Sequence, residues 1–255
     1  FKDERATTTL LLGGLSSTHD RLLAASLRNL GLKALALPST NISSFEVGRE
    51  YGNNGYCNPT YFTVGNLIKY LKDLEANGLS KKEIIDHYAF LTAGCNAPCR
   101  FGLMEIEYRM ALKDAGYHGF RVLVFKKEEG LTQSVRGVGI EINPQFFLAL
   151  VNAINVADII IGRSNEIRSK EVQAGDTDKV KEKAVRYLCK VLENREHIKL
   201  RPIWKKLGEK LDVDGLLQDI ATFVNQLTSK SLVIAVRETS TWFNNIIVDP
   251  LRPKT

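Results

Sequence analysis

The 255-residue sequence has little cysteine and little histidine, four of each. Four cysteines are too few for the disulfide framework of a small secreted domain. The longest uninterrupted apolar runs, such as Leu10–Leu12 and Ile159–Ile161, are far shorter than the roughly 20 residues that a membrane-spanning helix needs. The charged start has no apolar segment behind it, so no secretory signal is visible. These absences predict a cytoplasmic protein that does not contact a membrane.

The sequence also has no block of basic residues. Lys and Arg outnumber Asp and Glu by 35 to 29, which gives a net charge of +6 and favours anionic partners in general. The basic residues are spread along the chain, and the densest stretch, Lys179–Lys210, also contains many acidic residues. We therefore expect a solvated basic surface and no nucleic-acid partner.

Short apolar segments alternate with amphipathic ones over residues 1–140. Four of the apolar segments are typical of buried strands, namely Thr8–Leu12, Ala34–Leu37, Tyr88–Ala93 and Arg121–Phe125. Helical patterns lie between them: a helix capped by Ser17 or Thr18, one over Tyr61–Ala76, one opened by a capping box at Ser80, and one over Leu103–Ala115. This order predicts an α/β domain with a Rossmann-like parallel sheet and flanking helices.

Residues 141–255 have a different pattern, and we expect a mainly helical region packed on the first domain. The predicted helices are Gln145–Ala153, Thr177–Asn194, Arg201–Leu211 and Asp214–Leu227, with a returning strand at Leu232–Val236. Within the first domain, Ser39–Thr60 is rich in Asn, Gly and Ser and is expected to be a long irregular segment, of the kind that is often functional.

Three of the four cysteines, Cys57, Cys95 and Cys99, fall within 43 residues of each other. Thiolates are soft, anionic ligands for iron and zinc. Cys57 and Cys99 each precede a predicted helix, where unpaired backbone N–H groups favour a thiolate and an anionic cluster. Three cysteines suit an iron–sulfur cluster; buried thiols, an incidental disulfide or a zinc ion are the alternatives. Cys189 is expected to be an ordinary side chain on the apolar side of its helix.

Other candidate residues have plainer interpretations. Arg100, next to Cys99, can neutralise cluster charge or contact a phosphate. Gly13–Ser17 lacks the features of a phosphate-binding loop and is expected to be a turn with a helix cap. Glu105 and Glu107 do not share a helix face, so both are expected to be solvated. The tyrosines around Cys57 either screen a cluster from water or pack the loop: Tyr51, Tyr56 and Tyr61.

Several short strings together resemble the 2-hydroxyacyl-CoA dehydratase / benzoyl-CoA reductase superfamily. They are Gly48-Arg49-Glu50, Cys57-Asn58-Pro59, Val64-Gly65-Asn66 and Pro98-Cys99-Arg100-Phe101-Gly102. The resemblance covers residues 40–125 best. It is closest to the members associated with the CoA-substrate-specific enzyme activase.

The resemblance implies a [4Fe–4S] cluster, with two linked cubanes in some members, held by cysteines that match Cys57 and Cys99, with Cys95 beside them. It also implies an anaerobic, oxygen-sensitive protein that takes low-potential electrons from an ATP-hydrolysing activator and works as a dehydratase or reductase component. An oligomer and an acyl-CoA partner are further implications. The alternative is a non-catalytic structural or assembly module of a larger activase-type protein, with a structural cluster or zinc.

Overall fold

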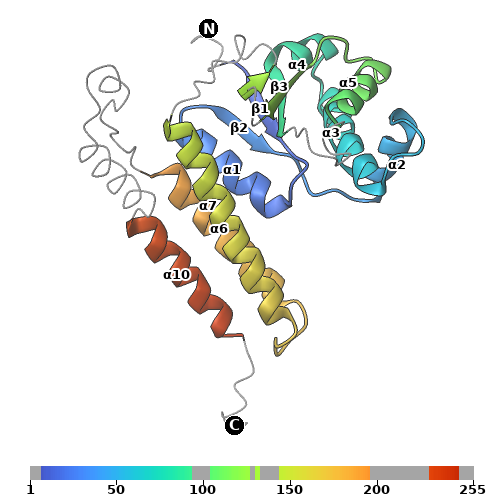
Figure 1. The fold of residues 1–255 in the computed structure, drawn as a ribbon. Helices are drawn as coiled ribbons and strands as arrows, with labels where there is room; N and C mark the ends of the chain where they lie inside the picture. Colours follow the sequence, from blue (N-terminus) through green and yellow to red (C-terminus); the bar gives the residue numbers. More distant parts are fainter. Residues whose placement is uncertain (1–6, 94–103, 127–129, 133–143, 196–229, 247–255) are drawn as a thin grey trace, which may run out of the picture. The chain divides into compact units, whose positions relative to one another are not determined.

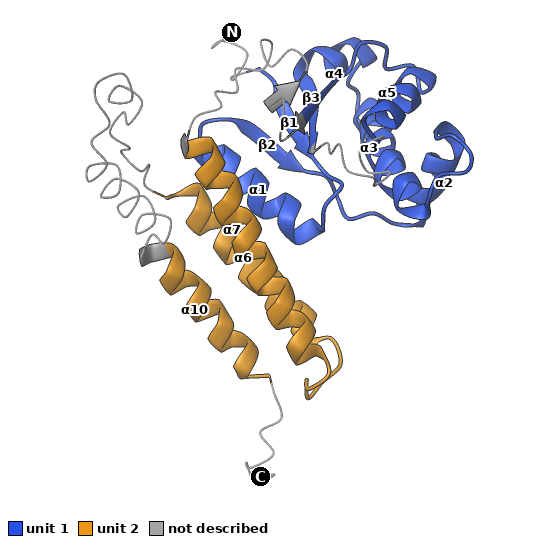
Figure 2. Ribbon diagram, viewed as in Figure 1, with its two compact units in different colours: residues 1–141 blue, residues 142–255 orange. Residues whose placement is uncertain are grey.

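The computed structural model describes residues 7–93, 104–126, 130–132, 144–195 and 230–246 (Figure 1). The chain divides into two compact units, residues 1–141 and 142–255 (Figure 2). Unit 1 contains the sheet, and unit 2 is helical in its described part.

The sheet of unit 1 has the strand order β2-β1-β3-β4-β5. Strands β1 (Thr9–Leu12), β2 (Lys33–Ala36), β3 (Tyr88–Ala93) and β4 (Arg121–Lys126) are parallel, and β5 (Gly130–Thr132) is antiparallel to β4. The predicted α/β class with a helix-rich second part is confirmed. The chain leaves β1 toward β2 and later returns to the other side of β1 to form β3. The strand order therefore reverses between β1 and β3, which is the usual ligand position in such sheets.

Helices cover both faces of this sheet (Figure 1). Helix α1 (Ser17–Asn29) joins β1 to β2 and covers one face; α3 (Asn58–Ala76), α4 (Lys81–His87) and α5 (Met104–Asp114) cover the other, and α2 (Ile42–Tyr51) packs on α3. Between the sheet and α3, α4 and α5 lies one continuous apolar core, which includes Leu11, Phe90, Leu67, Ile84 and Leu112. Burial of these side chains is the main source of stability of unit 1.

Helix α2 corrects the expectation that Ser39–Thr60 is irregular. Asn41 caps this helix, and its side chain accepts a hydrogen bond from the backbone N–H of Ser44 at 3.0 Å. The buried residues of α2 are Ser44 and Gly48, which are small rather than apolar. The sequence of α2 therefore lacks the apolar stripe by which a helix is usually predicted, because α2 packs on α3 through small residues and not through large apolar side chains.

Unit 2 contains α6 (Pro144–Arg168), α7 (Asp176–Glu193) and α10 (Lys230–Asn244). The predicted strand Leu232–Val236 is wrong, because this run of branched residues belongs to α10. Its buried residues recur at helical spacing, at Leu232, Ala235, Thr239 and Phe243. The predicted helices Arg201–Leu211 and Asp214–Leu227 lie outside the described residues.

Helix α6 is also much longer than the predicted Gln145–Ala153. Its residues Gln145–Arg168 have a mean hydropathy of 1.7 over the most apolar window, which gives the length and composition of a membrane-spanning helix. The core helix of a soluble protein meets the same criteria, and 39% of that window is buried inside the protein. Polar residues such as Asn152 and Asp158 interrupt the apolar residues of this helix, so its uninterrupted apolar runs are short.

The contact between α2 and α3 yields a test. A Cβ atom on Gly48 would overlap the carbonyl oxygen of Tyr61, and one on Gly65 would overlap that of Ser44. We expect Gly48→Ala and Gly65→Ala each to lower the free energy of unfolding by about 1–3 kcal/mol, because backbone atoms must move apart. Urea denaturation followed by circular dichroism measures this change.

Gly162→Ala is the matched control, since Gly162 lies in a helix and a Cβ there meets no atom within 4 Å. It should be neutral or stabilise by about 0.5–1 kcal/mol, the ordinary gain of alanine over glycine in a helix. Equal effects at Gly48 and Gly162 would contradict the close-contact interpretation.

Candidate functional site

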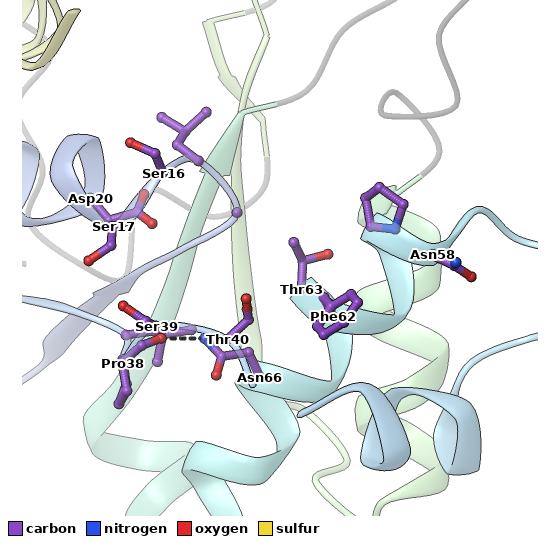
Figure 3. A pocket seen from close by; sticks show the side chains of 14 residues that line it. Ser16, Ser17, Asp20, Pro38, Ser39, Thr40, Asn58, Phe62, Thr63 and Asn66 are labelled. Atoms are coloured by element: carbon purple, nitrogen blue, oxygen red, sulfur yellow. Dashed lines mark hydrogen bonds between the residues drawn. The ribbon is translucent and has the colours of Figure 1, made fainter. Parts of the chain in front are cut away.

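A cavity of about 510 Å³ opens at the carboxyl edge of the sheet, beside the point where the strand order reverses (Figure 3). Its walls come from three segments of unit 1: Gly14–Ser17 after β1, Leu37–Thr40 after β2, and the first turns of α3. The side chains that reach it from the two helices include Asp20 of α1 and Asn58, Pro59, Phe62, Thr63 and Asn66 of α3.

Asn66 fixes the position of two of these walls. Its Nδ2 donates to the carbonyl of Pro38 at 2.8 Å, and its Oδ1 accepts from the Ser44 hydroxyl at 3.1 Å. The side chain is buried, so both hydrogen bonds are shielded from water. Asn66 therefore connects the end of β2 with α3 and with the first turn of α2.

Asp20 is the titratable side chain among the residues that line the cavity. It lies in the first turn of α1 and is 6% exposed. Burial raises the pKa of Asp20 from 3.8 to about 7, and a hydrogen bond from the backbone of Leu15 opposes this rise. Near neutral pH the carboxyl group is thus poised between a proton donor and an anion.

Tyr108 lies behind the same wall. It comes from α5 and is 1% exposed, and its hydroxyl lies 3.4 Å from the place that a Cβ on Gly14 would occupy. Within the described part of the chain this hydroxyl forms no hydrogen bond of ordinary geometry, although the Thr63 side chain approaches it. Burial raises the pKa of Tyr108, so the phenol is neutral and keeps its proton.

Cys57 lies at the N-cap of α3, next to the cavity residues Asn58 and Pro59. The thiol is exposed, and its Sγ lies 3.4 Å from the hydroxyl of Thr60. It makes no side-chain cap hydrogen bond to the helix backbone. The predicted position of this cysteine, directly before a helix, is correct.

Glu107 attaches the segment before Cys57 to α5. Its Oε1 accepts from the backbone N–H of Asn53 at 2.6 Å, and its Oε2 accepts from Asn53 Nδ2 at 2.9 Å. The Tyr61 hydroxyl donates to the carbonyl of Asn53 at 3.0 Å. Glu107 is 1% exposed, so the expectation that it is solvated is wrong. Its role was hidden because Asn53 lies 54 positions away in the sequence.

Two of the three tyrosines near Cys57, Tyr51 and Tyr61, make specific contacts. Tyr61 packs edge-on against Phe45, with ring centroids 5.8 Å apart, and holds Asn53. The Tyr51 hydroxyl accepts from Lys72 at 2.7 Å. Both contacts support the interpretation that these rings pack the loop.

Cys95, Cys99 and Arg100 lie outside the described residues. In the described part of the chain, no group of three or more His, Cys, Asp or Glu side chains could hold a metal ion. Cys189 is half-buried on α7. The predicted ligand set Cys57, Cys95 and Cys99 therefore stays a prediction.

No family model matches this chain, and no curated protein or solved structure is detectably similar to it.

The contact of Glu107 with Asn53 gives a prediction. Glu107→Ala should lower the free energy of unfolding by about 1.5–3 kcal/mol, because two hydrogen bonds to a buried carboxylate are lost. It should also speed amide hydrogen exchange over residues 53–57. Urea denaturation and exchange followed by mass spectrometry measure the two effects.

Glu105→Ala is the control on the same helix, since Glu105 forms an i,i+4 ion pair with Arg109 at 3.0 Å. Such pairs contribute less than about 1 kcal/mol. If both variants lose the same stability and Glu107→Ala leaves exchange over 53–57 unchanged, Glu107 does not hold this segment.

A further prediction concerns pH. Because the pKa of Asp20 is raised from 3.8 to about 7, the folded state keeps a proton that the unfolded state loses in this range. The contribution of Asp20 to stability is therefore complete below pH 4 and falls by about 1.4 kcal/mol per pH unit up to about pH 7. Asp20→Asn cannot ionise. It should match the wild type at pH 4 and exceed its stability at pH 8, and parallel pH profiles of urea denaturation for the two proteins would contradict this.

Proposed function

We propose that this chain is an iron–sulfur protein that accepts low-potential electrons from an ATP-dependent activator, with Cys57, Cys95 and Cys99 as cluster ligands and Arg100 beside them. The single observation that supports it most is the attachment of the Cys57 segment to α5. Glu107 and Asn53 join the chain just before Cys57 to the helix that follows Cys95 and Cys99.

Chain order supports the same arrangement. Cys95 is two residues beyond Ala93, the last residue of β3, and Cys99 is five residues before Met104, the first residue of α5. β3 and β1 are parallel neighbours, so β3 ends at the same edge of the sheet as β1. The cavity shows that α3 also begins at this edge. The end of β3, which leads into the segment with Cys95 and Cys99, and the start of α3 thus lie at the same edge of the sheet.

Cys57 itself fits a ligand role. It is exposed, and it caps a helix whose second residue is Pro59, which has no N–H group. The Thr60 hydroxyl, 3.4 Å from Sγ, is positioned to hydrogen-bond a thiolate sulfur. The positive end of α3 favours negative charge on that sulfur.

A bound cluster would supply one-electron redox chemistry at low potential, tuned by hydrogen bonds and charge around its sulfurs. The role of this protein would be to hold the cysteine sulfur atoms at fixed positions relative to one another. Glu107 and Tyr61 would restrain the segment before Cys57, because both hold Asn53.

The test is the iron and acid-labile sulfide content of the full chain, reconstituted anaerobically with ferrous iron and sulfide. The wild type should bind both and show the visible iron–sulfur absorption. Cys57→Ser, Cys95→Ser and Cys99→Ser should each lose iron and sulfide, because serine replaces a soft thiolate by a hard oxygen.

Cys189→Ser is the matched control and should keep the wild-type content. A wild type without iron and sulfide, or equal losses in all four variants, would overturn the proposal. Equimolar zinc without sulfide would also overturn it and identify a zinc scaffold.

The alternative, a non-catalytic assembly module, predicts a cluster that never accepts an electron. Addition of an ATP-hydrolysing activator and a reductant should, under our proposal, give an ATP-dependent paramagnetic signal of the reduced cluster. A cluster that stays oxidised under these conditions would favour the assembly module.

A further inference from the structure

We propose that the cavity at the carboxyl edge of the sheet binds a small organic acid, whose carboxylate lies between the first turn of α1 and the buried carboxyl group of Asp20. This inference concerns a ligand site in unit 1 and does not require the iron–sulfur cluster. It depends on four features of the cavity.

The first feature is the start of α1. The Ser16 side chain accepts from the backbone N–H of His19, and the N–H of Asp20 bonds the Ser16 carbonyl at 2.9 Å. Helix geometry leaves the N–H groups of Ser17 and Thr18 without an intrahelical acceptor. Ser17 lines the cavity, so this part of the helix can donate to an anionic oxygen. The first turn of α3, with Asn58, faces the same space.

The second feature is Asp20, which is more than nine-tenths buried and still lines the cavity (Figure 3). The Leu15 backbone hydrogen-bonds this carboxyl group. Burial favours the protonated form of this group, and a protonated carboxyl group can share its proton with a second carboxylate, as paired carboxyl groups do when they occupy one site. A bound carboxylate would thus receive hydrogen bonds from the helix and from Asp20.

The third feature is the Tyr108 hydroxyl behind Gly14. It is buried and keeps its proton, and it forms no ordinary hydrogen bond with described residues. A buried hydroxyl that makes no hydrogen bond of ordinary geometry is costly. Its oxygen lies 3.4 Å from the Cβ position of Gly14, which lines the cavity, so a polar group lies close behind this part of the wall.

The fourth feature is the balance of charge and apolar surface. Among the described residues no Lys or Arg lines the cavity, so a phosphate dianion would find no counterion on these walls. A cation would face the positive end of α1. Leu37, Pro59 and Phe62 form apolar walls, and about 510 Å³ is room for more than an isolated ion. A single carboxylate on a short apolar body fits these conditions.

Three ionisable side chains bear on the pH dependence of this site. Asp20 lies in the cavity, Tyr108 of α5 faces it from behind Gly14, and His19 of α1 contacts the Ser16 hydroxyl at 2.7 Å. Tyr108 stays neutral in the range of interest. His19 lies beside the first turn of α1, so it requires its own control.

The experiment measures butyrate binding to the full chain by calorimetry between pH 6 and pH 9, with inorganic phosphate and butyramide as comparison probes. Wild-type butyrate affinity should fall about tenfold per pH unit above pH 7, because Asp20 must hold a proton. Asp20→Asn keeps a donor at that position and should bind with little pH dependence. His19→Gln should retain the wild-type pH profile.

A second pair of variants tests the helix donors. Proline is favoured at the first position of a helix, and Ser16 already has the extended backbone that proline requires before it. Ser17→Pro therefore removes one N–H group with little effect on the fold, and it should weaken butyrate binding severalfold relative to Ser17→Ala.

Several results would overturn the proposal. They are no butyrate binding at millimolar concentration, phosphate or butyramide binding as tightly as butyrate, an unchanged pH profile in Asp20→Asn, or a profile that is lost in His19→Gln. Because these measurements do not depend on iron, failure here leaves the cluster proposal standing, and failure of cluster assembly leaves this one standing.

Discussion

A buried carboxylate fixes the geometry of the candidate site. Glu107 of α5 accepts two hydrogen bonds from Asn53, and through them it holds the segment that leads into Cys57. A charged group with 1% exposure is retained in a fold only where its partners are well placed, because removal from water is costly. The packing of α3 against α5 in the core makes this placement possible. Without Glu107, the segment before Cys57 would lose both hydrogen bonds to α5 and would keep the bond from the Tyr61 hydroxyl, which belongs to α3.

The cavity depends on a second set of close contacts, between α2 and α3. Gly48 and Gly65 let the two helix backbones approach, and this approach places the Ser44 hydroxyl within reach of Asn66. Asn66 then holds the Pro38 carbonyl at the end of β2. The contacts that hold this wall of the cavity thus come from small residues and one side-chain amide. The position of the wall follows from the register of β1 and β2, which are parallel and bring Gly14 and Leu37 to the same edge of the sheet.

The sequence predicted the strands and most helices of unit 1 because their apolar spacing is regular: β3 has the predicted bounds, and the capping box at Ser80 opens α4 as expected. The sequence did not indicate α2, because its buried face carries the small residues Ser44 and Gly48. The run Leu232–Val236 of α10 was predicted as a strand, because a short run of branched apolar residues is also typical of a buried strand. The position of Cys57 before a helix was predictable from local sequence. The buried state of Glu107 and the raised pKa of Asp20 were not, since both arise from segments that meet only in the folded chain.

Cys57 and the cavity share one structural element, the N-terminus of α3. Cys57 caps this helix, and the next two residues line the cavity, so negative charge on either side is favoured by the same backbone dipoles. The cavity also uses the first turn of α1, which is joined to β1 and not to the cysteine segments. The two sites therefore share part of their electrostatic environment and little of their donor set. A ligand in the cavity and a cluster on the cysteines would therefore use different donor groups at one edge of one sheet.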